Sequence, residues 1–489
     1  MEIKESELKF LNLMGHATSP EREMVLEALI LGLNMCLPER IIKDIIEIDK
    51  EKGQIIINNR RINIHEYSEI IIIGGGKATA LMCLELYILL DNILPIKGSI
   101  NVPKGQDVPA KMKESTFPIQ LFFSSHPIPD EEGARGVQNM FDILNRSPKN
   151  ALIFVLISGG GSALMTLPLE PLTLSDLKDL NKLLLQCGAD ITEINTIRKH
   201  LDAFKGGRLA RAIFPRTAFS LILSDVIGDP LEIIASGPTV PDPSTFSDVD
   251  KILNKYGLQH QIPERISKFI EDGKNLKISE TPKPEDPCFS PITNLLIGSA
   301  KLAEQAYEGY FEAKNIPSHP IETMKGEALE FGKNLAKKLF SFELIDRSVE
   351  KRMFYSSGEF TVTLKGKGVG GRNQEMLLGF LIQECDMIIK QAPDYLYFSE
   401  HFSYCLEACA FDGIEGNSPA MGAIIDSSTL GKIQKKMEMD SIEQVLDYLI
   451  GLANQNNSFE LFSNLNDALI VGYTGTNVND SLILLITKN

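Results

Sequence analysis

The chain has 489 residues, of which 43% are hydrophobic and 23% charged, which is an ordinary globular composition. At roughly 150 residues per domain, this length predicts two or three domains, and we expect two large ones. The formal net charge of -16 argues against a nucleic-acid partner, because phosphate backbones are bound mainly by an excess of Lys and Arg. It favours a protein with a small ligand.

The cysteines and the N-terminus predict a cytoplasmic location. Seven cysteines are scattered without a C-x-x-C pair, which is typical of reduced thiols. The opening segment MEIKESELKFLNLMGH mixes acids with bases and lacks the apolar centre of a signal peptide. No run approaches the roughly 18 apolar residues of a membrane span. We therefore expect no membrane association.

The N-terminal half alternates strands with helices. A helix is expected from Pro20, packed on the first domain, and GQIIINN with RINIHEY predicts a hairpin. The β-branched run EIIIIGGG predicts a buried parallel strand, followed by a helix over 78–90. Further strands are expected at GSINVP, IQLFFSS, ALIFVLIS and AFSLILS, with helices such as 131–144 between them. This alternation predicts a doubly wound, mainly parallel, Rossmann-like sheet.

A domain boundary is predicted where prolines and charges cluster, over 281–287. We therefore expect an N-terminal domain over 1–285 and a C-terminal domain over 286–489. The second begins with ITNLLIGSAKLAEQAYEGY and ends in DALIVGYTGTNVNDSLILLI, which predicts a smaller mixed α/β domain. The fold class is thus α/β with two domains, and we expect the ligand in a cleft between them.

Four glycine-rich loops are the main chemical feature. They are GGGKAT (74–79), SGGGSA (158–163), GKGVGGRNQE (366–375) and GYTGTNVND (472–480). Glycines after parallel strands let backbone N–H groups approach phosphate oxygens. A single such loop is more often a plain turn, but four favour a ligand site. None fits a P-loop, and Thr79 stands where a dinucleotide fingerprint needs its third glycine.

Cations accompany two of these loops. Lys77 lies at the start of a helix, where the dipole is unfavourable for a structural cation, so an anionic ligand is indicated. Arg372 lies in a glycine-rich turn, where a guanidinium suits a carboxylate or a phosphate. The alternative for Arg372 is an ion pair with Glu375, and the spacing alone leaves both open.

The segment after Asp190 predicts a helix with two faces. A buried stripe is expected from Ile191, Ile194, Ile197 and Leu201. The other face carries Asn195, Arg198, Asp202 and Lys205 and leads into the cationic turn 205–208, which favours anion binding. A simple ion pair between Arg198 and Asp202 is the alternative.

Acidic residues follow the strands. Asp225 and Asp229 come after AFSLILS, and Asp412 and Glu415 lie in the turn FDGIEG. Carboxylates at such positions can hold Mg²⁺ or take a proton from an attacking hydroxyl. For Asp412 an ordinary Asx turn is the alternative. His126 and His200 lie near these motifs and are second choices.

The ordered motifs resemble one known family. They are GGGKATA, SHPIPDEEG, ISGGGSAL, EINTIRKHLDAFKGGRLA, SDVIGDPLEIIASGPT, KGKGVGGRNQE, FDGIEG and GYTGTNVND. In this order, over about four hundred residues, they look like the class II glycerate kinases, whose C-terminal part is the MOFRL domain. Members are sometimes labelled hydroxypyruvate reductases.

The resemblance implies ATP-dependent phosphorylation of the 2-hydroxyl of D-glycerate, with Mg²⁺, to give 2-phosphoglycerate and ADP. Lys77, Asp225 and Arg372 match the active-site lysine, aspartate and arginine of the family. The chain departs from the family at FDGIEG, where Phe411 and Glu415 replace threonine and aspartate, and at Asp202, where a serine is usual.

We accordingly assign catalytic roles to Lys77, Asp225 and Arg372, and a metal role to Asp225 and, more weakly, Asp412. The alternatives are an NAD(P)H-dependent hydroxypyruvate reductase and a non-catalytic sensor of phosphorylated hydroxy acids, and a homodimer is left open. The residues expected to bind substrate or phosphate are Gly75, Gly76, Ser158, Gly159, Gly160, Gly161, Ser162, Asn195, Arg198, Lys205, Gly370, Gly371, Asn373, Glu375, Thr476 and Asn477.

Overall fold

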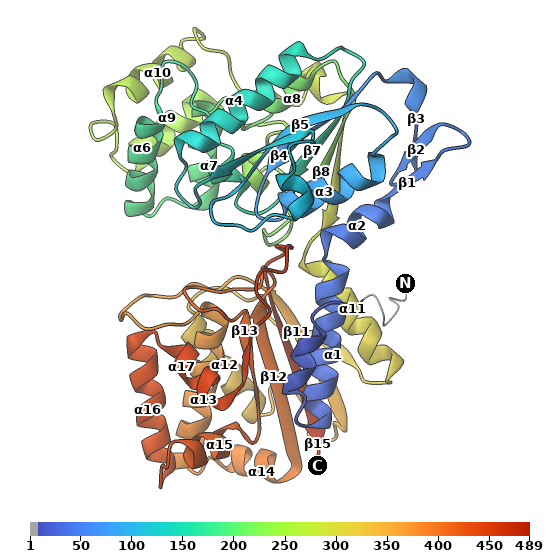
Figure 1. The fold of residues 1–489 in the computed structure, drawn as a ribbon. Coiled ribbons are helices and arrows are strands. Elements are labelled where there is room, and N and C mark those ends of the chain that lie inside the picture. The colour runs from blue at the N-terminus through green and yellow to red at the C-terminus, as the bar shows by residue number, and fades with distance from the viewer. Residues whose placement is uncertain (1–7) are drawn as a thin grey trace. The chain divides into compact units, whose positions relative to one another are not determined.

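The computed structural model describes residues 8–489, which form two compact units (Figure 1). One unit spans 38–298, and the other combines 8–37 with 299–489. The second unit is therefore built from both ends of the chain.

The unit 38–298 contains a six-stranded parallel sheet with the order β6-β5-β4-β7-β8-β9. This is the strand order of dinucleotide-binding α/β folds, and the direction of winding reverses between β4 and β7. Every residue of β4, β7 and β8 is buried, as expected for strands covered on both faces. The strands are β4 (Ile70–Gly75), β5 (Ile96–Pro103), β6 (Ile119–Ser124), β7 (Leu152–Ile157), β8 (Ala218–Leu223) and β9 (Ile292–Gly298). The predicted Rossmann-like sheet is confirmed.

Helices and a hairpin complete this unit. Those associated with the sheet are α2 (Pro38–Ile45), α3 (Thr79–Leu90), α4 (Glu131–Arg146), α5 (Gly161–Leu164) and α8 (Arg208–Ile213). The predicted hairpin is part of β1 (Ile46–Asp49), β2 (Gln54–Ile57) and β3 (Arg60–Asn63), which pair antiparallel. Short 3₁₀ turns are η3 (Ile64–Glu66), η4 (Ala110–Lys113), η5 (Ile234–Ser236) and η6 (Pro287–Phe289).

Four helices share a core of their own beside the sheet. They are α6 (Leu174–Gln186), α7 (Ile191–Leu201), α9 (Phe246–Lys255) and α10 (Glu264–Lys274). Ile194, Ile197 and Leu201 belong to that core, as predicted. Ile191 does not, because it is the first residue of α7 and the core begins one turn later, so its side chain is 54% exposed.

The predicted boundary at 285/286 is corrected by strand β9. This strand is the segment ITNLLIG, which was predicted to begin the second domain. In the structure it pairs in parallel with β8, with Ala218 opposite Ile292, and forms the edge of the first sheet. The proline-rich stretch is a loop within the first unit, and the change of unit comes at 298/299.

The other unit contains a mixed six-stranded sheet with the order β10-β11-β15-β12-β13-β14. Only β10 and β11 pair in parallel. The strands are β10 (Ser318–Pro320), β11 (Lys351–Gly358), β12 (Phe402–Ala410), β13 (Gly422–Asp426), β14 (Ala468–Leu469) and β15 (Asp480–Lys488). The predicted mixed α/β character is confirmed.

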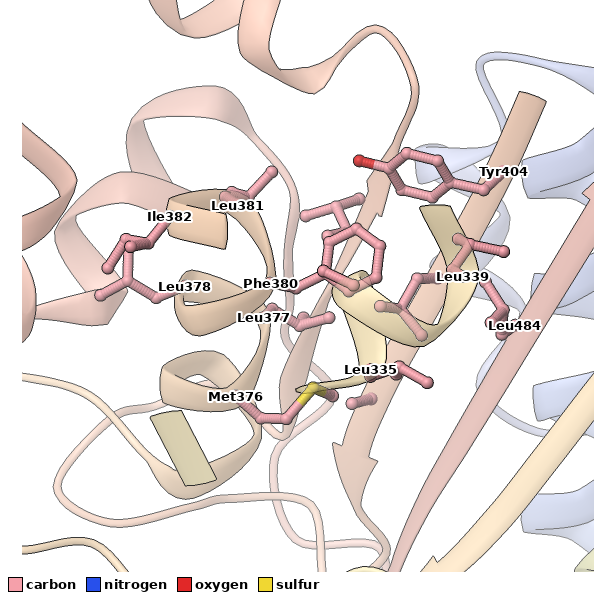
Figure 2. Packing of buried hydrophobic residues seen from close by; sticks show 14 of the residues in the cluster. Leu335, Leu339, Met376, Leu377, Leu378, Phe380, Leu381, Ile382, Tyr404 and Leu484 are labelled. Atoms are coloured by element: carbon pink, nitrogen blue, oxygen red, sulfur yellow. The ribbon is translucent and has the colours of Figure 1, made fainter. Parts of the chain in front are cut away.

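A large apolar core joins this sheet to helices, and α12 and α13 are at its centre. Met376 and Phe380 of α13, Leu335 and Leu339 of α12, and Tyr404 of β12 lie together (Figure 2). A side chain on Gly332 or Gly379 would overlap with the backbone of the opposite helix, so glycine permits the close crossing. The helices are α12 (Ala328–Phe340), α13 (Arg372–Ile389), α14 (Pro393–His401), α15 (Thr429–Lys436), α16 (Ile442–Gln455) and α17 (Ser458–Leu465).

The N-terminal helix α1 (Pro20–Met35) packs in this second unit, which corrects the prediction that it covers the first domain. It follows the 3₁₀ turn η2 (Leu11–His16) and contacts α11 (Ala300–Ala313), β12 and β15. Two features fix it there. Gly32 leaves room for the Tyr307 ring, and Arg22, only 1% exposed, pairs with Asp426 and with Asp467 at 2.5 Å.

We predict that Arg22→Met destabilises the protein by about 3 to 5 kcal/mol, because two buried carboxylates lose their cation. Urea denaturation monitored by circular dichroism measures this. Arg135→Met, which removes an exposed pair with Glu132, is the matched control and costs less than about 1 kcal/mol. Equal effects of the two substitutions would contradict the structural role of Arg22.

A buried acid lies in β12, an interior strand of this sheet. Glu407 of β12 has Ile424 and Ile483 as its neighbours on the adjacent strands and is fully buried. Burial raises the pKa of Glu407 to about 8, and the nearby Cys409 thiol offsets only part of that increase. The folded protein therefore carries a protonated glutamic acid at neutral pH.

This raised pKa predicts a loss of stability with rising pH. Between about pH 4.5 and about 8 the folded state holds a proton on Glu407 that the unfolded chain has released. The free energy of unfolding therefore falls through that window, by up to about 1.4 kcal/mol per pH unit from this group. Glu407→Gln removes this contribution, so the variant gains stability over wild type from pH 5 to pH 8 in urea titrations. The exposed Glu400→Gln serves as control, and parallel pH profiles of wild type and Glu407→Gln would contradict the assignment.

Candidate active site

Two predicted glycine loops meet at the switch point of the parallel sheet. The loop 74–79 follows β4 and the loop 158–163 follows β7, and these two strands are neighbours. Gly74 and Gly76 have φ values of +144° and +150°, and a side chain on either would overlap with the adjoining β7 segment. Glycine is therefore required for the contact between the loops.

Hydrogen bonds join the two loops. The N–H of Lys77 donates to the carbonyl of Gly159 at 2.9 Å, and the N–H of Ala78 donates to Ser158 Oγ at 3.0 Å. The Ser158 hydroxyl also lies 3.2 Å from Thr79 Oγ1. Ser158 is fully buried, so its side chain holds the start of α3 in place. A ligand role for Ser158 stays a prediction.

Lys77 and His126 both lie close to Gly160. A Cβ atom on Gly160 would be 3.6 Å from Lys77 Cγ and 3.0 Å from Cδ2 of His126. The carbonyl of Lys77 accepts a hydrogen bond of 2.7 Å from the Gln106 amide, which fixes the backbone of this loop. The structure thus brings a cation and an exposed imidazole to the glycine loop after β7.

Asp225 lies at the same edge of the sheet. It follows β8, the neighbour of β7, and its side chain is half-buried. Ser224 fixes the local turn, because its hydroxyl accepts from the N–H of Val226 at 3.2 Å. Asp225 and the two glycine loops therefore all follow the carboxyl ends of neighbouring strands.

Lys205 has an internal role, which corrects its prediction as an anion ligand. Its ammonium donates to Met165 O at 2.8 Å, to Thr166 Oγ1 at 3.1 Å and to Asp202 Oδ2 at 2.5 Å. These contacts use all three N–H donors of a lysine whose side chain is 2% exposed. Burial lowers the pKa of Lys205, and Asp202 offsets only part of this decrease.

The same contacts explain Asp202, one of the departures from the family motif. Besides Lys205, its carboxylate accepts from the N–H of Phe204 at 2.8 Å and from the N–H of Leu167 at 3.2 Å. Asp202 thus neutralises the buried lysine and ends α7. Within the described residues, the alternative ion pair between Arg198 and Asp202 does not form. The Arg198 guanidinium instead donates a hydrogen bond to Asn181 Oδ1 at 2.5 Å.

Ser236 is a further residue of this site that was not predicted from the sequence. This fully buried serine donates from its Oγ to Asn195 Oδ1 at 3.0 Å and lies 2.9 Å from Ser162 Oγ. Asn195 and Ser162 are both predicted ligand residues, and Ser236 joins them. The signal available in the sequence was the run of small residues ASGP at the end of SDVIGDPLEIIASGP.

In the other unit, Arg372 begins helix α13 and is held by two acids. Its guanidinium makes a bidentate pair with Asp480, at 2.5 and 2.6 Å, and lies 3.1 Å from Glu359. Burial raises the pKa of Asp480 to about 6, although Arg372 opposes this shift. The alternative prediction, an ion pair between Arg372 and Glu375, is wrong, because the Glu375 carboxylate lies 3.3 Å from the Asn456 amide.

Glu415, in the FDGIEG turn, binds the N-terminus of α13. Its carboxylate accepts from the N–H of Asn373 at 2.7 Å, the N–H of Gln374 at 3.1 Å and the Gln374 amide at 2.9 Å. Gly371 leaves the room for this side chain. The helix dipole favours a carboxylate here, whereas burial raises the pKa of Glu415 to about 7. The Glu415 carboxylate therefore occupies the N-terminus of α13, where a ligand was predicted to bind.

The last glycine loop, 472–480, is tied to the same turn. Thr474 donates from its hydroxyl to the carbonyl of Phe411, and its N–H donates to the carbonyl of Asp412 at 3.2 Å. Thr476 and Asn477, both predicted ligand residues, are buried. Within residues 8–489, the buried side-chain amide of Asn373 has no hydrogen-bond partner. This unsatisfied amide is the feature of the second unit that best fits a ligand contact.

The predicted metal residues belong to different units, Asp225 to one and Asp412 to the other. Over the described part of the chain, no group of three or more His, Cys, Asp or Glu side chains could hold a metal ion. None of the helices in residues 8–489 is long and apolar enough to cross a membrane. All seven cysteines are free thiols.

Comparisons with known proteins cover nearly the whole chain. Residues 24–271 match a domain of unknown function, DUF4147, and residues 352–480 match the MOFRL family. The chain is 33% identical to the "Glycerate 2-kinase" of Pyrococcus horikoshii, over 96% of this chain and 98% of that protein. It is likewise 33% identical to the "D-glycerate 2-kinase" of Thermotoga maritima, over 92% of this chain and 99% of that protein.

A solved structure agrees with these sequence matches. The crystal structure of glycerate kinase from Thermotoga maritima superposes with a TM-score of 0.75 and 30% identity, covering 95% of this chain and 99% of that one. Sequence and fold therefore agree over almost the full length. The chain belongs to the glycerate kinase family that carries the DUF4147 and MOFRL domains.

Proposed function

We propose that this protein is an ATP-dependent glycerate 2-kinase, which phosphorylates the 2-hydroxyl of D-glycerate to give 2-phosphoglycerate and ADP. The observation that carries the proposal is the pair of glycine loops at the switch point, with the Lys77 side chain beside Gly160. This is where open α/β sheets bind phosphate ligands. The relatives named glycerate 2-kinases supply the choice of substrate.

Phosphoryl transfer asks the protein mainly for positioning and for neutralisation of charge. In the proposed reaction the 2-hydroxyl oxygen bonds to the γ-phosphorus while the bond to the β–γ bridging oxygen breaks. Lys77 neutralises the transferring group, and the backbone of Gly159, Gly160 and Gly161 lines the phosphates. Asp225 orients the hydroxyl and accepts its proton.

The remaining assignments follow the same chemistry. Arg372 is assigned to the neutralisation of phosphate charge, for which an anion has to displace Asp480 or Glu359 from the guanidinium. Mg²⁺, when bound, would neutralise phosphate oxygens. Asp225 is the residue proposed to hold it, with the nucleotide phosphates as the other ligands, and Asp412 is a weaker second choice.

The net charge of -16 supports small-molecule substrates, with no role for nucleic acid or a membrane, and we place the protein in the cytoplasm. A homodimer stays a prediction.

The product identifies the reaction. With ATP and D-glycerate, we expect a phosphoglycerate that enolase consumes directly, without a mutase, because only the 2-phosphate is its substrate. Phosphorus NMR of the mixture confirms the isomer. Oxidation of NADH by hydroxypyruvate would instead favour the reductase, and tight glycerate binding in calorimetry without ADP release would favour the sensor.

Substitutions test the assigned roles. Lys77→Met and Asp225→Asn should each lower kcat at least about 100-fold, because each removes a charge that acts on the transferring group or the nucleophile. At Arg372 the substitution is Arg372→Lys rather than Arg372→Ala, because lysine keeps a cation beside the buried Asp480. Thermal melts check folding, and the exposed Lys149→Met is the control with wild-type activity. Near wild-type turnover in folded Lys77→Met or Asp225→Asn would refute the assignments.

A further inference from the structure

Three consecutive residues adopt left-handed backbone conformations next to the glycine loops. Ala235 has φ +49° and ψ +24°, Ser236 has φ +59°, and Gly237 has φ +61° and ψ +55°. This region is unfavourable for residues other than glycine, and such strain persists only where the surroundings impose it. Strained segments of this kind cluster at functional sites.

This segment contacts two other loops of the same unit. The N–H of Gly206 donates to the carbonyl of Ser236 at 3.0 Å, and the N–H of Gly207 donates to the carbonyl of Gly237 at 2.8 Å. In addition, a Cβ atom on Gly161 would lie only 2.9 Å from the Ala235 methyl group. The segment therefore packs directly against the loop after β7.

The hydroxyl of Ser236 sets the direction of a short hydrogen-bond chain. Its single proton goes to Asn195 Oδ1, at 3.0 Å. The contact of 2.9 Å with Ser162 Oγ must then be a bond that Ser162 donates. Ser162 donates its only hydroxyl proton to Ser236. The Ser162 oxygen can therefore only accept a further hydrogen bond.

An oxygen that can only accept is a poor ligand for ATP phosphates, whose oxygens also accept. It suits a ligand hydroxyl. We propose that Ser236 is a positioning residue that makes Ser162 the acceptor for a hydroxyl group of glycerate. This inference rests on the proposed function, and it replaces the phosphate role that the sequence suggested for Ser162.

The substitution Ser236→Gly tests this directly, because glycine adopts φ +59° freely and only the hydroxyl is lost. We expect kcat/KM for D-glycerate to fall about tenfold, as for the loss of one oriented hydrogen bond. KM for ATP should stay within about twofold, and the melting temperature within about 3 °C of wild type. A role limited to folding would change the melting temperature and both substrates together.

Ala235→Gly is the matched control. It relaxes the neighbouring backbone but keeps Ser162, Ser236 and Asn195, so its kcat/KM for D-glycerate should stay within about twofold of wild type. The proposal is overturned if Ser236→Gly leaves the glycerate parameters unchanged, or if KM for ATP rises while glycerate is unaffected. Glycerate phosphorylation by the wild-type enzyme is measured first, before any variant is compared. If the wild-type enzyme does not phosphorylate glycerate, the proposed function itself is refuted.

Discussion

The contact on which the first unit depends is the approach of two backbone segments where β4 and β7 end. Gly74 and Gly76 lie so close to the β7 segment that no side chain fits, and Lys77 and Ala78 then bond to Gly159 and Ser158. The contact places Lys77 beside the glycine loop that follows β7. A ligand site built on such strand ends gains rigidity from the sheet itself.

Buried charge is neutralised internally in both units. Lys205 is matched by Asp202, Arg372 by Asp480, and the start of α13 by Glu415. Cations that look available to anions in the sequence are thus already satisfied in the fold, because burial of an unpaired charge is costly. Lys77 differs in position, because its side chain lies beside the glycine loop rather than within a core.

Much of the fold could be predicted from the sequence, because local signals were strong. The β-branched run of β4 and the glycines after it allow few alternatives. The docking of α1 could not be predicted, because its partners Asp426 and Asp467 lie far along the chain. Likewise, helical spacing predicted Lys205 on a polar face. Spacing could not predict that its ammonium binds the carbonyl of Met165, 40 residues earlier in the chain. Ser236 carries no charge and no periodic signal, and the run ASGP around it does not indicate its partners, so its role follows from the hydrogen bonds of the fold.

The inclusion of α1 in the C-terminal unit makes the segment 38–298 an insertion within another folding unit. On the ribosome, α1 is made early, but Asp467, the partner of Arg22, follows 445 residues later. At about 5 to 20 residues per second this delay is on the order of tens of seconds. The inserted unit has all of its own strands before then, so it can fold while Arg22 still lacks its buried partners. Synthesis of the chain thus imposes an order in which the interrupted unit is completed last.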